Sequence, residues 1–393
     1  MTLPTNVAII GAGPAGALLS HMLDRAGIGS IVVERSSRDH VLGRIRAGVL
    51  EWGTVELLRE VGLGDRMDAE GHVHDGTGIV WGGREVLTID IQKFAGSHFM
   101  SYGQTMLQED LYAAAEQRNA QIHFGADDVE LHDVTGDRPS VTFTSGGERQ
   151  RIEADYVIGC DGFHGASRKA IPAGVLRTYE KEYPFGWLGI LSETPPLEDL
   201  IYAHHERGFA LASQRNPMLS RYYVQCPLTD SVDDWSDDRF WSELTTRLGP
   251  AVGGTVVTGP SIEKSIAPLR SFVAEPMRHG NLFLAGDAAH IVPPTGAKGL
   301  NLAVSDVFYL SRALVAHYEQ GDDHYLDGYS EMALRRVWGS VRFSWWLTTL
   351  LHRFPDQTDF DLRAQEAELD YLASSTHAQA AMAEQYAGLP FEI

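Results

Sequence analysis

The sequence predicts an α/β fold: a Rossmann-like domain built from separated segments, a mostly antiparallel sheet domain and a helical C-terminal part. Three observations lead to this prediction. A short apolar strand at residues 7–10 runs into a Gly-x-Gly-x-x-Gly turn and a helix. Two further apolar segments, 156–162 and 282–290, contain Asp-Gly and Gly-Asp turns. Residues 183–267 carry strand-like, aromatic-rich segments typical of an antiparallel sheet.

These observations also place the domain boundaries. We expect the Rossmann-like domain to comprise residues 1–75, 97–182 and 268–345. The second domain is expected to comprise residues 76–96 and 183–267, with a helix over 238–248. Residues 346–393 form the helical C-terminal part. We also predict amphipathic helices over 48–62 and 107–118 from the spacing of their apolar residues.

Composition excludes several classes of protein. The net charge of −21 argues against nucleic acid or an anionic membrane as a partner. Cys160 and Cys226, the two cysteines, form no recognisable metal spacing or disulfide framework, so we expect no metal and a reducing cytoplasm. The apolar N-terminus has no preceding Lys or Arg and is interrupted by glycines, unlike a signal peptide. No apolar run approaches the length of a membrane span.

The glycine turn at residues 11–16 predicts a dinucleotide site. Gly11, Gly13 and Gly16 allow a tight turn and a close approach of the backbone to a pyrophosphate at the helix N-terminus. Glu34 ends the next apolar strand, where a carboxylate accepts hydrogen bonds from ribose hydroxyls. Further on, Arg44 and Arg46 flank an apolar residue, so an extended segment presents both on one face toward a phosphate or carboxylate.

Two other features have competing interpretations. His72 and His74, without further ligands, do not make a zinc site. The run 343–351 is apolar all round, which fits either a buried core helix or a subunit interface. We favour the interface, because aromatic residues are enriched on such surfaces, and therefore expect a homodimer.

The three turns together resemble those of the single-component FAD-dependent aromatic hydroxylases. Further segments, 43–48, 213–215, 220–223, 293–299 and 386–390, resemble the members of this family that act on 4-hydroxybenzoate, and the similarity runs nearly end to end. The resemblance implies hydroxylation of 4-hydroxybenzoate at C3, giving 3,4-dihydroxybenzoate. It also implies tightly bound FAD, NADH or NADPH as a transient co-substrate, O₂, and a flavin C4a-hydroperoxide.

The flavin site implied by the resemblance has a physical rationale. Asp287 ends a strand beside the glycine turn, placed to accept from a ribityl hydroxyl; the alternative is an ordinary helix N-cap. The segment from Gly296 to Asn301 opens a helix whose N–H groups would face the N1/C2 edge of a flavin. The resemblance also implies that Arg221 helps to hold the flavin in the conformation competent for reduction. The remaining contacts implied in this region are Glu34, Arg44, Gln104, Lys298 and Gly299.

The substrate site needs a carboxylate clamp and a way to ionise a phenol. Arg215 offers a planar fork for a carboxylate, with Ser213 on the same strand face and Tyr223 as a second neutral donor. A phenol has a pKa of about 10, so phenolate formation requires donors to its oxygen. By resemblance that donor is Tyr202, backed by Tyr386. His74 would be the far end of a proton path, and the Pro294 carbonyl would lie beside the substrate hydroxyl.

The coenzyme contacts depart from the family pattern at two positions. The NADPH-selective members carry Gln and Tyr where this chain has Ser36 and His40, although Arg35 remains. We therefore predict that NADH is used well, alongside or ahead of NADPH. There is no second Gly-x-Gly-x-x-Gly, so we expect the coenzyme to bind transiently in a surface groove. The resemblance places its other contacts at Arg44, His164, Arg168 and Arg270.

Two alternatives stay open at this stage. One is a flavoprotein hydroxylase for another phenolic or amino-benzoic acid, such as 3-hydroxybenzoate or 4-aminobenzoate. The other is a non-catalytic regulator that binds a flavin or nucleotide. The combination of Arg215 with Tyr202 and Tyr386 argues against both.

Overall fold

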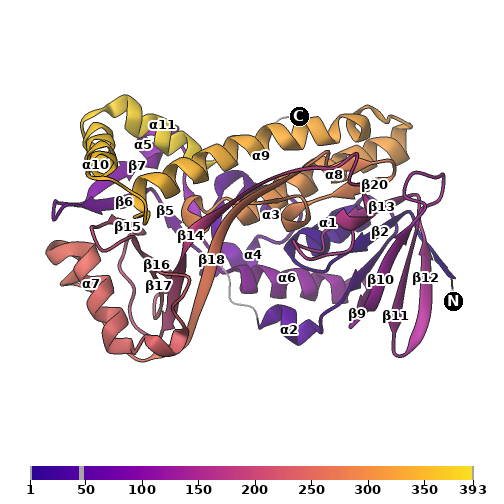
Figure 1. Ribbon diagram of the computed structural model, residues 1–393. Coiled ribbons are helices and arrows are strands. Elements are labelled where there is room, and N and C mark those ends of the chain that lie inside the picture. The colour runs from indigo at the N-terminus through magenta and orange to yellow at the C-terminus, as the bar shows by residue number, and fades with distance from the viewer. Residues whose placement is uncertain (1, 44–47, 392–393) are drawn as a thin grey trace.

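The computed structural model describes residues 2–43 and 48–391. Arg44 and Arg46 therefore lie outside the described residues. The predicted α/β class is confirmed: a largely parallel sheet lies at one end of an elongated molecule and a large mixed sheet at the other (Figure 1). The helix α9 (His324–Leu351) runs along both.

The nucleotide-binding sheet has six strands in the order β19-β20-β13-β2-β3-β9. Their bounds are β19 (Arg278–His279), β20 (Leu282–Leu284), β13 (Tyr156–Gly159), β2 (Val7–Ile10), β3 (Ser30–Glu34) and β9 (Gln121–Phe124). All neighbours pair in parallel except β19 with β20. The central strands are apolar because both faces are covered. Their carboxyl ends bring the three predicted turns to one edge.

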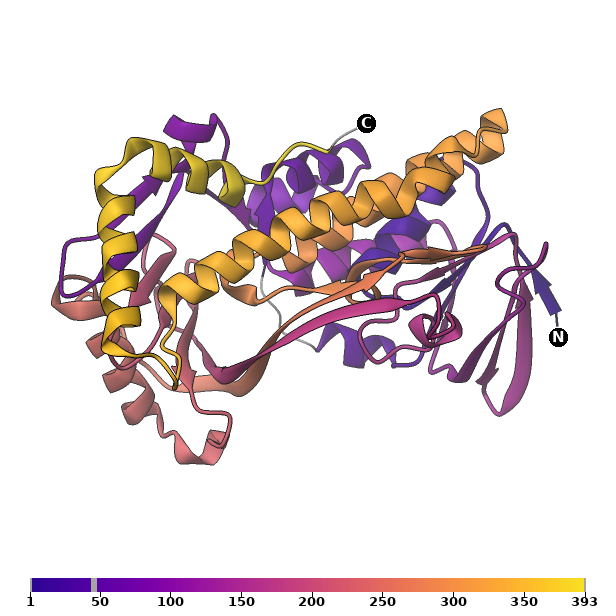
Figure 2. The same ribbon diagram turned by 45° about the horizontal axis from the view of Figure 1, so that its top comes forward.

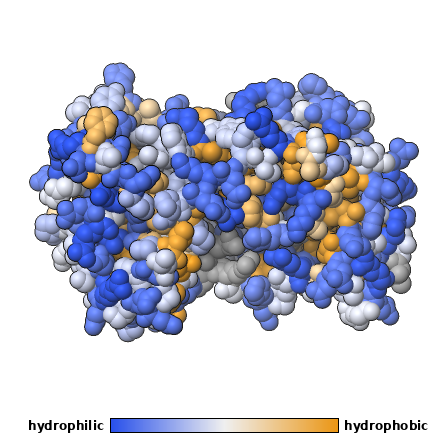
Figure 3. All heavy atoms as spheres, in the orientation of Figure 1, coloured by the Kyte–Doolittle hydropathy of each residue, from blue (hydrophilic) through white to orange (hydrophobic). Residues whose placement is uncertain are grey.

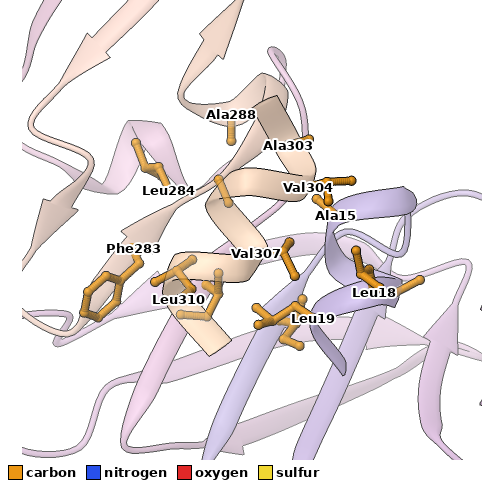
Figure 4. Packing of buried hydrophobic residues seen from close by; sticks show 14 of the residues in the cluster. Ala15, Leu18, Leu19, Phe283, Leu284, Ala288, Ala303, Val304, Val307 and Leu310 are labelled. Carbon is orange, nitrogen blue, oxygen red and sulfur yellow. The ribbon is translucent and has the colours of Figure 1, made fainter. Parts of the chain in front are cut away.

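Two helices cover one face of this sheet. The helices α1 (Pro14–Arg25) and α8 (Gly299–Gln320) pack against each other, with Leu19 of the first beside Val307 of the second (Figure 4). The helix α1 ends at Arg25, just before Gly27, whose positive φ of 71° favours glycine. The helix α6 (Gln104–Gln117) also contacts α1 and spans most of the predicted 107–118 segment.

Two smaller sheets flank this core. One contains β1 (Thr2–Pro4), β12 (Glu148–Glu153), β11 (Ser140–Ser145) and β10 (Asp127–His132). The other contains β4 (Val49–Glu51), β8 (Phe99–Ser101) and β5 (His72–His74). The prediction of one helix over 48–62 is wrong at its start: β4 precedes α3 (Trp52–Glu60), because residues 49–51 pair with β8. Two short helices, α2 (Arg38–Leu42) and α4 (Asp65–Glu70), belong to the same half of the chain.

The large sheet has eight strands in the order β21-β18-β14-β17-β16-β15-β6-β7. They are β21 (His290–Ile291), β18 (Ser261–Glu275), β14 (Arg177–Ser192), β17 (Leu219–Cys226), β16 (Ala210–Asn216), β15 (Ile201–His204), β6 (Gly76–Trp81) and β7 (Leu87–Asp90). Only β15 and β6 pair in parallel. The long strands β14 and β18 connect the two ends of the molecule (Figure 1). The helix α7 (Asp237–Gly253) packs on this sheet.

The C-terminal part is helical, as predicted. After α9 come α10 (Asp359–Ser374) and α11 (Thr376–Ala387), and α11 packs on the short α5 (Ile91–Ala95) (Figure 2). Most of the apolar run at the end of α9 packs inside this chain: Phe343, Leu347 and Leu351 are at most 1% exposed. The core interpretation thus accounts for most of the run, whereas Trp345 is 44% exposed.

The surface is mostly polar on the face seen in Figure 3, with smaller apolar areas between the polar side chains. Within the described ranges, none of the helices combines the length and apolar character needed to cross a membrane.

Candidate active site

A cavity of about 1500 Å³ lies along the carboxyl edge of the nucleotide-binding sheet and reaches the large sheet. Glycines shape its floor. A Cβ at Gly11, where φ is +102°, would lie 2.3 Å from the carbonyl oxygen of Cys160, and one at Gly16 would lie 1.9 Å from that of Gly11. At Gly13, by contrast, no atom lies within 4 Å of the Cβ position. A side chain there would therefore fill the cavity itself.

Two helix N-termini open onto this cavity. The helix α1 begins after Gly13, and α8 begins after Lys298; neither has a side-chain cap or an acidic residue in its first turn. Residues of both first turns line the cavity, including Pro14, Ala15 and Leu300. Their N–H groups and positive dipole ends therefore favour a phosphate at one site and an electron-rich carbonyl edge at the other.

Three acidic residues surround the turns. Glu34 lines the cavity and accepts hydrogen bonds from the N–H groups of Ala12 and Ser36, both at 2.8 Å. Asp287 is exposed to the cavity and lies inside a 3₁₀ turn, Gly286–Ala288, where it makes no capping hydrogen bond. The alternative of an ordinary N-cap is therefore wrong for Asp287. Asp161 instead holds its own turn, accepting from Ser167 N and Oγ, both at 2.9 Å.

These features fit FAD. The open glycine at Gly13 and the α1 N-terminus would hold the pyrophosphate, Asp287 a ribityl hydroxyl, and the α8 N-terminus the flavin N1/C2 edge. Among the other predicted contacts, Arg35, Gln104 and Gly299 line the cavity.

Gly296, Lys298 and Asn301 do not line this cavity, and they instead fix the start of α8. Asn301 uses its side chain fully: it accepts from Glu51 N and Thr54 Oγ1, both at 2.9 Å, and donates to two carbonyl groups. A Cβ at Gly296 would lie 2.8 Å from Ser344 Oγ. Lys298 donates to Glu51 at 2.7 Å and to the Tyr386 carbonyl at 3.0 Å.

Three of the predicted coenzyme contacts gather around Phe163. The guanidinium groups of Arg168 and Arg270 lie 4.8 and 4.6 Å from its ring centroid, and His164 packs edge-on against it at 5.0 Å. Arg270 also pairs with Glu180 at 3.1 Å. His164 lines the cavity, whereas Arg168 and Arg270 do not.

The predicted carboxylate clamp lies on the β16–β17 hairpin. Ser213 pairs with Arg221 across the two strands and donates to its carbonyl oxygen at 2.8 Å. The predicted shared face of Ser213 and Arg215 rests on strict alternation, which is interrupted here, because the register shifts between Gln214 and Asn216, where Arg215 lies. A β-bulge re-aims a side chain and is common beside active sites.

Arg215 lacks a counterion among the described residues. Its Nη1 donates to the Gln214 carbonyl oxygen at 3.0 Å, and its buried Nε has no hydrogen-bond partner. Burial accordingly lowers the pKa of the Arg215 guanidinium. A bound carboxylate would supply the missing partner.

Arg221 is fully engaged, in contrast. Its Nε donates to Tyr223 Oη at 3.1 Å, its Nη1 to Glu263 at 3.1 Å and its Nη2 to Ser265 Oγ at 3.4 Å. Gly189 makes room for this group, since a Cβ there would lie 2.7 Å from the Tyr223 ring. Arg221, Tyr223 and Glu263 line the cavity, whereas Ser213 and Arg215 do not.

The two predicted tyrosines form a buried pair. Their hydroxyl oxygens are 2.8 Å apart, and Tyr202 also donates to the Thr295 carbonyl oxygen at 2.9 Å. Because Tyr202 donates there, Tyr386 is the donor within the pair. Burial raises the pKa of both phenols, so both are neutral near pH 7. Pro294 lies next to Thr295 and lines the cavity.

His74 is placed near this pair without touching it. Its ring stacks on Phe99 at 4.7 Å, and Phe99 in turn meets Tyr386 edge-on at 5.2 Å. Its Nε2 lies 3.0 Å from Ser101 Oγ, and burial lowers the pKa of His74 to about 4. His72, exposed at the surface, packs edge-on against it.

Sequence reasoning missed three charged residues of this region. Glu51 is buried and bridges Lys298 at 2.7 Å and Arg336 at 2.9 Å. Arg336 also donates to the Leu389 carbonyl oxygen at 2.6 Å, so this cluster holds the segment that follows Tyr386. Glu263 is the partner of Arg221. The sequence pattern that could have indicated Glu51 is a single acidic residue at the end of a short apolar strand.

Comparison with known proteins identifies relatives of this chain. Residues 4–344 match the family model described as FAD binding domain. The chain is 52% identical over 394 residues to the p-hydroxybenzoate hydroxylase of Acinetobacter baylyi, covering 100% of this chain and 97% of that protein. It is 28% identical over 320 residues to a rifampicin monooxygenase of Streptomyces venezuelae, covering 80% and 64%.

Solved structures agree on the fold. The p-nitrophenol 4-monooxygenase PnpA of Pseudomonas putida superposes with a TM-score of 0.82 at 20% identity, covering 98% of this chain and 99% of that one. A complex of aklavinone-11 hydroxylase with FAD and aklavinone gives a TM-score of 0.72 at 22% identity, covering 88% and 69%. By its sequence, this chain belongs to the family of FAD-binding monooxygenases that includes the p-hydroxybenzoate hydroxylase of A. baylyi.

Proposed function

We propose that this enzyme is a FAD-dependent 4-hydroxybenzoate 3-monooxygenase. It converts 4-hydroxybenzoate, NAD(P)H, a proton and O₂ into 3,4-dihydroxybenzoate, NAD(P)⁺ and water. The full-length identity to a p-hydroxybenzoate hydroxylase supports this assignment. The structural observation that carries it is Arg215, an arginine on β16 without an ion-pair partner among the described residues. The neighbouring strand β15 carries Tyr202, whose hydroxyl forms a buried pair with that of Tyr386 on α11.

Each group has a task in this proposal. Bound FAD supplies the chemistry that accepts a hydride and activates O₂. Arg215, assisted by Ser213 and Tyr223, binds the substrate carboxylate. Tyr202 turns its hydroxyl from Thr295 to the substrate phenol and stabilises the phenolate, which is the reactive form of the ring.

The phenol proton needs a route to solvent. Tyr386 already donates to Tyr202, so the pair can pass a proton along by reorienting both hydroxyls. His74 is neutral near pH 7 because its pKa is lowered to about 4, and it lies between this pair and exposed His72. We assign His74 to the outer end of the path, with Pro294 offering its carbonyl beside the substrate hydroxyl.

We assign NADH as a good co-substrate. Selectivity for NADPH requires groups that grip its 2′-phosphate. Ser36 is a short neutral residue and His40 is exposed on α2. Arg38 pairs with Glu116 at 2.9 Å, which leaves Arg35 as the cation of residues 35–40 that makes no ion pair within the described part of the chain. His164, Arg168 and Arg270 form the nicotinamide-coenzyme surface in this proposal.

We also propose a homodimer in the cytoplasm. Trp345 and Trp338 are both partly exposed and lie two turns apart on α9, as the aromatic residues of a subunit interface would. Two free cysteines and the use of NAD(P)H suit a reducing compartment.

Steady-state kinetics tests the activity. We expect 4-hydroxybenzoate to stimulate oxidation of NADH by the FAD-loaded protein strongly, with 3,4-dihydroxybenzoate as the product. Stimulation by 3-hydroxybenzoate or 4-aminobenzoate instead would assign the pocket to another aromatic acid. Failure of all three acids to stimulate oxidation would contradict an enzymatic role.

A further inference from the structure

Two arginines lie on the β16–β17 hairpin, Arg215 and Arg221, and they differ in how their charge is balanced. Burial, together with the nearby cation of Arg221, lowers the pKa of Arg215. Arg221 has a carboxylate partner, Glu263, at 3.1 Å, while Arg215 has none among the described residues. The two arginines therefore share one carboxylate, Glu263, and these three groups together carry one net positive charge.

The sheet register fixes this pairing. Leu191 on β14 lies directly opposite Arg221 on β17 and also directly opposite Glu263 on β18. Residues opposite one another across strands project from the same face, so Glu263 and Arg221 reach over Leu191 to meet. Arg221 is 4% exposed and lines the cavity, so its charge acts on whatever is bound there.

We infer that Glu263 is a specificity-determining residue that acts through Arg221. It neutralises Arg221 and so leaves the net positive charge that one substrate carboxylate balances. This inference rests on the proposed function. It predicts that the charge of Glu263 controls how strongly the pocket distinguishes a carboxylate from a neutral group of the same shape.

The test compares two ligands of nearly equal shape, 4-hydroxybenzoate and 4-hydroxybenzamide. Their dissociation constants are measured by flavin difference absorbance on the FAD-loaded wild type and on Glu263→Gln. The substitution leaves Arg221 uncompensated, so the preference for the acid over the amide should rise at least tenfold, the effect expected of one added unit charge about 12 Å away at an effective dielectric of about 20. The exposed Glu198→Gln removes the same charge elsewhere and should leave the ratio unchanged.

Two further variants separate charge from structure. Glu263→Asp keeps the negative charge and should keep the ratio of the wild type. The double substitution Glu263→Gln/Arg221→Gln restores the net charge and should return the ratio to within about threefold of the wild type. If Glu263→Gln loses FAD, the single Arg221→Gln carries the test: it leaves the Glu263 carboxylate uncompensated, so the preference for the acid over the amide should fall about tenfold, and an unchanged ratio would overturn the inference.

The outcomes are distinct. Equal weakening of both ligands in Glu263→Gln, with an unchanged ratio, would mean that Glu263 only supports the fold, and it would overturn the inference. A wild type that binds neither ligand would refute the proposed function itself, and the inference with it. If the wild type hydroxylates 4-hydroxybenzoate but Glu263→Gln has the same ratio of the two dissociation constants, the inference is overturned and the proposed function stands.

Discussion

Replacing Arg215 by methionine tests the carboxylate clamp, because it should affect substrate binding and protein stability in opposite directions. Methionine keeps much of the volume of the side chain and removes the charge. In the ligand-free protein this charge has no counterion within the described part of the chain, and its Nε lacks any partner. Removing an uncompensated, partly buried cation should therefore leave the protein as stable or about 1 kcal/mol more stable.

The same substitution should weaken the binding of the substrate. A charge-assisted contact to a carboxylate contributes about 3 kcal/mol, which corresponds to a dissociation constant weaker by roughly 100-fold. At a ligand concentration about 100 times the dissociation constant, the wild type gains about 2.7 kcal/mol of stability from binding. The Arg215→Met variant should gain only about 0.4 kcal/mol at that concentration.

Chemical denaturation with and without 4-hydroxybenzoate measures both quantities in one experiment. The control is Arg207→Met, an exposed arginine between β15 and β16 that pairs with Glu243, and it should behave as the wild type in binding. A variant that binds 4-hydroxybenzoate within tenfold of the wild type would refute the clamp. A variant that is strongly destabilised without ligand would show that Arg215 supports the fold instead.

Three further predictions follow from the buried groups around the pocket. Tyr202→Phe should still consume NADH but release mainly H₂O₂, because the phenolate loses its donor; full product yield by chromatography would remove Tyr202 from the mechanism. Gly388→Ala should lower the free energy of unfolding by about 2–4 kcal/mol, since φ is +85° and a Cβ would lie 2.1 Å from Glu51 Oε2. The control Gly328→Ala, with no atom within 4 Å of its Cβ position, should stabilise α9 slightly. Equal urea midpoints for these two variants would contradict the prediction. Burial lowers the pKa of His352 to about 3, so the unfolded chain takes up a proton first, and the free energy of unfolding should fall by about 2 kcal/mol between pH 6.5 and pH 4.5. A His352→Gln variant with the same pH slope as the wild type would refute this assignment.

Local patterns predicted the nucleotide-binding half of the fold well. The apolar strands ending in glycine turns leave few alternatives to a parallel sheet, and all three turns lie at one edge as expected. The same reasoning failed at residues 49–51. Their helical periodicity is overridden by pairing with β8 and by the hydrogen bond from Glu51 N to Asn301, a residue 250 positions away.

The candidate site was predictable in its residue types but not in its connections. The bulge that holds Arg215 depends on the register of β16 against β17. The alternation of residue types along one strand does not reveal a register shift against its neighbour. The ion pairs of Glu51 and Glu263 join strands or helices far apart in sequence. Contacts of this kind depend on the tertiary fold. The composition of the chain and the spacing of its residues therefore do not predict them.

The measurement that tests the central claim most directly follows the oxygen atoms. The FAD-loaded enzyme is supplied with NADH, 4-hydroxybenzoate and ¹⁸O₂, and the product is analysed by mass spectrometry. We predict 3,4-dihydroxybenzoate with a single ¹⁸O atom, formed in nearly equal amount to the NADH oxidised. A product without the label, or NADH oxidation that yields only labelled H₂O₂, would contradict the assignment of this chain as a 4-hydroxybenzoate 3-monooxygenase.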